Sequence, residues 1–176
     1  MASPALTSKL EADVEIKATP EQFHDMYTSK PHHVHHTCGD KVQGCELLEG
    51  EWGKASSIIT WRYVHGGKDR VSKQVIEAID HEKNSITFRV IEGDVLKEYK
   101  SFVTTLQASP RSDGSGGSVV HWSLEYEKLH HEIDHPETLL QLLQDVSDEC
   151  VKDRVAEARW DAEEGIAVLI AVAFFG

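Results

Sequence analysis

Hydrophobic and polar residues alternate near the start of the chain. Acidic residues separate a row of apolar side chains at every second position, namely Leu10, Ala12, Val14 and Ile16, and Lys17 follows. Successive side chains of a β-strand point to opposite faces, so this period of two predicts a strand with one dry and one wet face.

The pattern changes after this strand. Thr19 is a suitable helix N-cap, and Pro20 occupies the first helical position, where its missing N–H costs nothing. Phe23 and Tyr27 give the short helix an apolar side. Pro31 ends it and begins a second, histidine-rich piece. We therefore expect two short helices between the first and second strands.

The central part of the chain has strand patterns only. The candidate strands are 42–49, 56–65, 70–80, 84–92, 95–107 and 118–128. Short connections join them, including an acidic turn at Gly93, where glycine can adopt the positive φ that reverses the chain. No helical period of useful length interrupts this region, which predicts an antiparallel meander.

A helix is expected after Pro136, with Glu137 in its first turn near the positive end of the helix dipole. Its apolar positions recur every three or four residues, at Leu139, Leu143, Val146 and Cys150. Such a stripe can pack on a sheet. About seven strands packed on one long helix make an α+β fold.

Polar residues indicate which face of each strand is buried. Arg62 marks the outer face of the 56–65 strand, so Ile59, Trp61 and Tyr63 are expected to point inward. The same reasoning assigns further residues to the inner face: Ile86, Phe88, Val90, Val120, Trp122, Leu124 and Tyr126.

The strand over 70–80 permits two readings. In one, Lys73 and Glu77 share the inner face with Val75 and could serve as a buried acid and base. In the other, which we favour, the inner face carries Ser72, Gln74, Ile76 and Ala78.

A single helix covers only part of a strongly bent sheet, so some inward aromatic surface is left over. This surplus predicts a cavity with apolar walls and a few polar tips, the character of a small-molecule site. Tyr63, Tyr99 and Tyr126 would supply the tips, because a buried phenol needs a hydrogen-bond partner. The alternative is that these aromatic residues simply fill the core.

Composition excludes several other functions. The 176 residues carry 30 acidic and 18 basic side chains, and this net charge of −12 argues against binding nucleic acid. Three cysteines without metal-binding spacing, and an N-terminus without a signal-like segment, favour a reducing, cytoplasmic location. At this length one domain can bury a substantial core.

Histidines gather at His32, His33, His35 and His36. In a helix, His32 and His36 would share a face at a spacing able to bind zinc, but no further ligands complete a closed site. We therefore predict surface histidines and no metal. The loop around Gly50 and Gly53 lacks the spacing of a phosphate-binding loop, and no cofactor motif is present.

Three segments together resemble the major latex protein family of plants, a branch of the Bet v I superfamily. They are Leu48–Trp61 with its glycine-bearing loop, the strand–turn–strand Val90–Phe102, and Trp122–Leu129. The resemblance covers roughly residues 5 to 148. It implies a helix-grip fold: a seven-stranded curved antiparallel sheet wrapped around a long C-terminal helix, with two short helices between strands 1 and 2.

The resemblance also implies a function. Such proteins are expected to carry or sense small hydrophobic metabolites of the hormone, sterol or phenolic class, in defence or stress responses. Alternation leaves the inner face of the strand over 95–107 undecided, and the resemblance favours Tyr99, Ser101 and Val103 as inward residues. The expected ligand-binding set is Phe23, Tyr27, Ile59, Trp61, Tyr63, Ile86, Phe88, Val90, Tyr99, Ser101, Val103, Val120, Trp122, Leu124, Tyr126, Leu139, Leu143 and Val146. The alternative is a cavity enzyme of isomerase, cyclase or condensing type, using Lys73, Glu77 and Tyr99.

The end of the chain departs from this pattern. We expect a ligand-binding domain over 1–160 and an atypical tail over 161–176, where Gly165 precedes an apolar run of about eleven residues. That run is shorter than the ~20 residues that span a bilayer, so packing against the protein itself is favoured over membrane contact. A monomer or weak dimer is expected.

Overall fold

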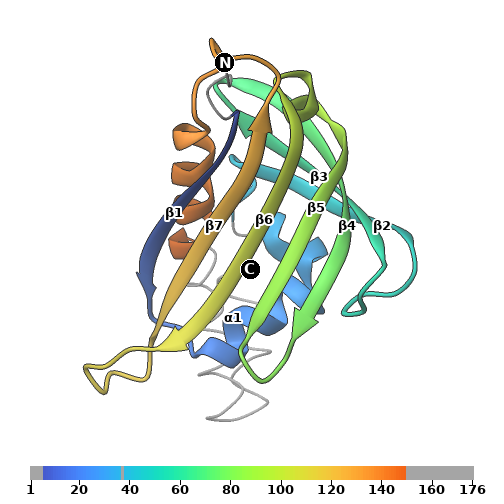
Figure 1. The fold of residues 1–176 in the computed structure, drawn as a ribbon. Coiled ribbons are helices and arrows are strands. Elements are labelled where there is room, and N and C mark those ends of the chain that lie inside the picture. Colours follow the sequence, from blue (N-terminus) through green and yellow to red (C-terminus); the bar gives the residue numbers. More distant parts are fainter. Residues whose placement is uncertain (1–5, 37, 150–176) are drawn as a thin grey trace.

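The computed structural model describes residues 6–36 and 38–149. One antiparallel sheet of seven strands dominates it, in the order β1-β7-β6-β5-β4-β3-β2. The strands are β1 (Thr7–Ile16), β2 (Val42–Glu49), β3 (Ile58–His65), β4 (Lys68–Asp80), β5 (Ser85–Gly93), β6 (Tyr99–Pro110) and β7 (Ser118–Lys128). Figure 1 shows the sheet bending around the helices. This is the α+β architecture that the residue pattern predicts, in the helix-grip form that the resemblance implies.

Two short helices carry the chain from one edge of the sheet to the other. They are α1 (Pro20–Thr28) and the 3₁₀ helix η1 (Pro31–His36), which lie between edge strands β1 and β2. The predicted cap of α1 is confirmed: the Thr19 side chain accepts a hydrogen bond from the Gln22 N–H, and the Gln22 side chain accepts one from the Thr19 N–H. This reciprocal capping satisfies two backbone donors at the helix start.

The predicted meander from β2 to β7 is confirmed, with one local difference after β5. A short 3₁₀ helix, η2 (Asp94–Lys97), replaces the expected start of the next strand at residue 95. Gly93 precedes it with φ +133°, a conformation that side-chain-bearing residues rarely adopt. The Asp94 carboxylate accepts a hydrogen bond of 2.7 Å from the Val71 N–H, which fixes the turn against β4.

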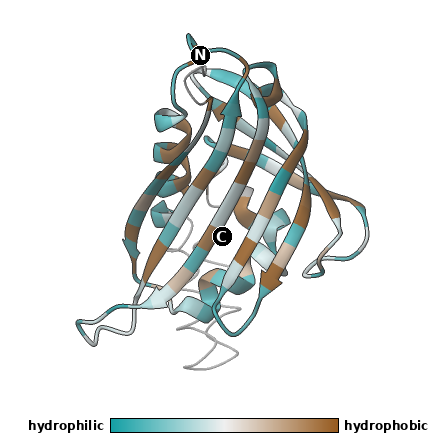
Figure 2. Cartoon of the chain, in the orientation of Figure 1, coloured by the Kyte–Doolittle hydropathy of each residue, from teal (hydrophilic) through white to brown (hydrophobic). Residues whose placement is uncertain are grey.

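The inner face of β3, β5 and β7 is the one that alternation predicts. Ile59 is 0% exposed and Trp122 is 1% exposed. Also buried are Tyr63, Ile86, Phe88, Val90, Val120, Leu124 and Tyr126. Figure 2 shows the alternation as brown and teal bands along the strands.

The prediction for β6 was wrong at two positions. The pairing of β6 with β7 shifts register between Tyr99 and Ser101, so one residue is inserted and the side-chain alternation changes phase. Tyr99 and Phe102 are therefore both buried, whereas Ser101 and Val103 lie on the outer face at intermediate exposure.

The structure resolves the two readings of β4 in favour of the second over most of its length. Ser72 and Ile76 are buried, whereas Lys73 and Glu77 form ion pairs outside. The Lys73 ammonium lies 3.8 Å from Glu92, and the Glu77 carboxylate lies 2.8 Å from Arg89. A register shift between Ile76 and Ala78 leaves Ala78 exposed, contrary to that reading.

The C-terminal helix is described over 137–149 and packs on the inner side of the bent sheet. Leu139 and Val146 of the predicted apolar stripe are buried and Leu143 is partly buried; Leu140, outside that stripe, is buried as well. Cys150, the boundary at residue 160 and the tail 161–176 lie outside the described residues. Within the described ranges, none of the helices is both long enough and apolar enough to cross a membrane.

Candidate functional site

A partly enclosed cavity lies between the inner face of the sheet and the C-terminal helix. The space in it that the centre of a water molecule can reach is about 90 Å³. One water needs about 10–15 Å³ by the same measure, so the cavity has room for a small organic molecule.

Six strands (β2 to β7), η2, α1 and the C-terminal helix contribute to its wall. The lining residues are Tyr27, Val42, Trp61, Tyr63, Ser72, Gln74, Phe88, Val90, Val95, Phe102, Thr104, Trp122, Leu139, Leu142, Leu143 and Val146. None of these side chains is ionisable at neutral pH, and most are apolar. The wall therefore favours a hydrophobic guest.

Half of the expected ligand-binding set lines the cavity: Tyr27, Trp61, Tyr63, Phe88, Val90, Trp122, Leu139, Leu143 and Val146. A second group is buried in the surrounding core without lining it: Phe23, Ile59, Ile86, Tyr99, Val120, Leu124 and Tyr126. Ser101 and Val103 are on the outside, as described above.

Three aromatic residues hold one side of the cavity in shape. The ring centroid of Tyr27 on α1 lies 6.1 Å from that of Trp61 and 5.6 Å from that of Trp122, and the Tyr27 and Trp122 rings meet edge to face. Such tilted contacts are the favourable geometry for aromatic pairs. The Trp122 indole N–H donates a hydrogen bond of 2.8 Å to Ser147 on the C-terminal helix.

The polar groups of the wall concentrate on β3 and β4. The Gln74 amide donates a hydrogen bond of 2.9 Å to the Ser72 hydroxyl. Burial raises the pKa of Tyr63 to about 12, so its phenol is uncharged at physiological pH. Thr104, from β6, adds one further hydroxyl.

Seven lining residues were missing from the sequence prediction: Val42, Ser72, Gln74, Val95, Phe102, Thr104 and Leu142. Ser72 and Gln74 were in the favoured inner-face reading of β4, so strand alternation could have placed them in the site. Phe102 and Thr104 could not be found this way, because the register shift at the start of β6 is invisible in the apolar pattern.

The structure does not bring the conditional catalytic set together in the cavity. Lys73 and Glu77 point outward into ion pairs. Tyr99 is buried, but its hydroxyl donates a hydrogen bond of 2.5 Å to the Asp134 carbonyl and it does not line the cavity. Tyr126 is similarly engaged, at 2.5 Å from the His135 ring.

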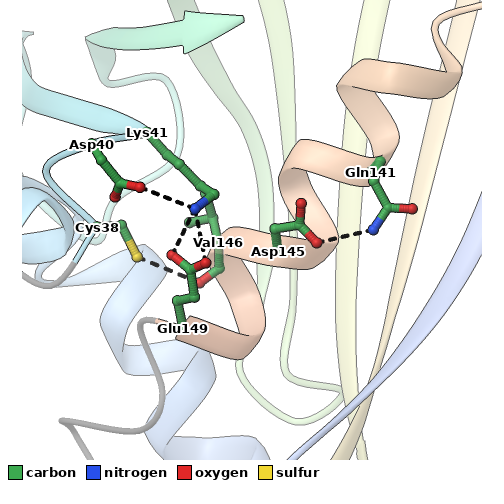
Figure 3. A network of polar contacts seen from close by, with 7 residues as sticks. All are labelled: Cys38, Asp40, Lys41, Gln141, Asp145, Val146 and Glu149. Carbon is green, nitrogen blue, oxygen red and sulfur yellow. Dashed lines mark hydrogen bonds and ion pairs between the residues drawn. The ribbon is translucent and has the colours of Figure 1, made fainter.

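A polar network ties the C-terminal helix to the segment before β2 (Figure 3). The Lys41 ammonium binds both Glu149 and Asp40. Beside it, the buried Cys38 thiol contacts the Val146 carbonyl at 3.8 Å. These contacts position the face of the helix that lines the cavity.

One histidine of η1 packs against an aromatic side chain. The His32 ring stacks on Trp52, with centroids 4.3 Å apart. In the portion of the chain that the structure describes, no three His, Cys, Asp or Glu side chains gather as a metal site would require. The side chains of His35 and His36 lie outside the described residues, so the prediction for that pair stays open.

Comparison with known proteins places this chain in a family. Residues 5–157 match the pathogenesis-related protein Bet v 1 family. The chain is 54% identical to MLP-like protein 43 of Arabidopsis thaliana over 153 residues, which are 87% of this chain and 96% of that protein.

Two further comparisons agree. MLP-like protein 34 of Arabidopsis thaliana is 56% identical over 151 residues, 86% of this chain, but the chain spans only 48% of that relative. The crystal structure of major latex-like protein 151 from Panax ginseng gives a TM-score of 0.76 at 37% identity, covering 81% of this chain and 93% of the other. The chain therefore belongs to the MLP-like group within the pathogenesis-related protein Bet v 1 family.

Proposed function

We propose that this protein binds small hydrophobic plant metabolites in its internal cavity, as a carrier or sensor in defence or stress responses. The observation that carries the proposal is the cavity itself, a space of about 90 Å³ walled by apolar and aromatic side chains. Removing apolar ligand surface from water contributes roughly 25 cal/mol per Å², so such a wall can supply affinity without any charged contact.

The size of the cavity bears on the ligand class. A compact phenolic or hormone-sized molecule suits the space better than a sterol, which would need the helix to move outward. The net charge of −12 disfavours nucleic acid as a partner. A cytoplasmic monomer or weak dimer suits a carrier of this kind.

Titration with a hydrophobic fluorescent probe tests the proposal. We expect saturable enhancement with one site per chain, and a loss of affinity of about tenfold in Trp61→Ala, because that ring lines the cavity. Trp52→Ala is the matched control: Trp52 stacks on His32 and does not line the cavity, so probe affinity should hold.

Two outcomes would contradict the proposal. One is an absence of saturable binding by the folded protein. The other is equal loss of probe affinity in both tryptophan variants, which would locate the probe away from the cavity. If neither outcome occurs, mass spectrometry of small molecules that co-purify from native tissue would identify the physiological ligand.

A further inference from the structure

Two neutral polar side chains form a pair on the cavity wall. Ser72 and Gln74 are two positions apart on β4, both line the cavity, and the Gln74 Nε2 lies 2.9 Å from the Ser72 Oγ. Ser72 is 3% exposed, so its hydroxyl is cut off from bulk solvent. Ser72 therefore lies in the interior of the site, and Gln74 beside it is partly buried.

This pair has unused hydrogen-bonding capacity. With its amide donating to Ser72, Gln74 keeps a carbonyl oxygen as an acceptor, and the Ser72 hydroxyl keeps its own hydrogen as a donor. Neither of these groups has a further hydrogen bond to a described residue. A ligand hydroxyl could use both, donating to the amide oxygen and accepting from the serine.

Apolar residues surround the pair. Ser72 lies opposite Trp61 on β3, and Gln74 lies opposite Val90 on β5. A ligand that places one polar group on this pair would therefore rest its remaining surface on a hydrophobic wall. This arrangement favours a ring compound with a single polar substituent.

Charge sets the second requirement. No Asp, Glu, His, Lys or Arg is among the described residues that line the cavity. The cations nearest in sequence to Ser72 and Gln74 are already paired with acids, since Lys73 lies 3.8 Å from Glu92 and Arg70 lies 4.0 Å from Asp94. A carboxylate entering the cavity would lose its hydration without gaining a counter-charge, which is strongly unfavourable.

We propose that the cavity selects uncharged aromatic ligands bearing one hydroxyl group, and that Ser72 and Gln74 bind this hydroxyl. This inference rests on the proposed function, because it assigns a ligand class and a polar subsite to the same cavity. It separates neutral phenols from aromatic carboxylic acids of equal size.

Three ring-matched compounds test the proposal by displacement of the fluorescent probe: naphthalene, 2-naphthol and 2-naphthoate, at neutral pH. We expect 2-naphthoate to bind at least about tenfold more weakly than 2-naphthol, the equivalent of ~1.4 kcal/mol. Comparable affinity for the acid and the phenol would overturn the inference.

The variant Gln74→Leu tests the subsite. It should reduce the affinity ratio of 2-naphthol to naphthalene by about five- to tenfold, because it removes the acceptor while keeping the apolar volume. Gln107→Leu makes the same change at an exposed position of β6 and should leave the ratio as in the unmodified protein. Ser72→Ala, a smaller change, should reduce the ratio in the same direction as Gln74→Leu.

The outcomes separate this inference from the proposed function. If naphthalene binds and Gln74→Leu leaves the ratio unchanged, the subsite is wrong but the cavity is a ligand site. If none of the three compounds displaces the probe from the folded protein, the proposed function fails as well. Retained naphthalene affinity in Gln74→Leu shows that the variant is folded.

Discussion

Lys41 donates hydrogen bonds of 2.8 and 3.0 Å to the two carboxylate oxygens of Glu149, joining the segment before β2 to the C-terminal helix. The hydrogen bonds to Glu149, and then to Asp40, raise the pKa of the Lys41 ammonium, which therefore stays charged at physiological pH. The same helix carries Leu143 and Val146 into the cavity wall. The ion pair thus helps to hold this part of the cavity wall in place (Figure 3).

Replacing Lys41 with methionine should lower the free energy of unfolding by about 0.5–1 kcal/mol, since the pair is partly exposed to solvent. The effect should shrink in about 1 M salt, which screens the pair, and urea unfolding at both salt concentrations measures it. Lys9→Met is the control. Lys9 pairs with Glu11 on the exposed face of β1, so its loss should lower the free energy of unfolding by less. Equal effects of the two variants would show that the link to the helix adds nothing.

A second link between sheet and helix is buried. The Trp122 indole donates to the Ser147 hydroxyl at 2.8 Å, and that hydroxyl donates to the Leu143 carbonyl at 2.7 Å. Ser147→Ala would leave the indole N–H without its partner, which should lower the free energy of unfolding by about 1–3 kcal/mol. Ser109→Ala, at an exposed position of β6, should change it little.

A double-mutant cycle separates this hydrogen bond from packing. In Trp122→Phe the donor is already gone, so adding Ser147→Ala should cost much less than it does in the unmodified protein. Additive losses in urea unfolding would mean that the hydroxyl acts through its contact with Leu143 alone.

Alternation along the strands predicted the sheet and most of its inner face because a charged residue usually marks the outside. Arg62 does so on β3, and Ile59 and Tyr63 are buried as expected. The resemblance that favoured Ser101 and Val103 as inward residues was wrong at these two positions, because one inserted residue changes the phase of β6. Such a bulge leaves no apolar signature in the sequence.

The cavity was less predictable than the fold for a related reason. Burial and cavity lining are different properties: Leu124 and Trp122 are both buried on β7, yet only Trp122 reaches the cavity. Which inward residue meets the helix and which meets the void depends on where the helix crosses the sheet. A single sequence contains the stripe of the helix but not its crossing position.

Gly93 offers a test of the turn after β5. Its φ is +133°, and a Cβ added there would collide with the Val71 carbonyl oxygen of the neighbouring strand. Gly93→Ala should therefore lower the free energy of unfolding by about 3 kcal/mol or more, combining backbone strain with the clash.

Gly66→Ala provides the comparison in thermal or urea unfolding. Gly66 has φ +62° with no atom within 4 Å of the added Cβ, so only the backbone conformation is penalised. The free energy of unfolding should fall by about 1 kcal/mol in this variant. Similar losses in both glycine variants would mean that the close approach of Gly93 to β4 is relieved by a small shift.

The last prediction concerns pH and the buried His24. Its Nε2 lies 3.0 Å from the His81 Nδ1, and a hydrogen bond between two imidazoles requires one nitrogen to remain unprotonated. Burial, and then the nearby His81, lower the pKa of His24, although Asp25 and Asp80 oppose this. The unfolded chain therefore binds a proton more readily at this residue than the folded protein does. Stability should fall as the pH drops below the unfolded value of about 6.5.

His121 titrates in the opposite sense and serves as the internal comparison. Its hydrogen bond to Asp13 raises its pKa, so its contribution is fully present below the unfolded pKa and is lost as the pH rises through the folded pKa. Urea unfolding between about pH 5.5 and 7.5 should show a smaller acid loss of stability in His24→Gln and a larger one in His121→Gln. Parallel pH profiles for His24→Gln and the unmodified protein would show that the buried imidazole pair does not govern acid stability.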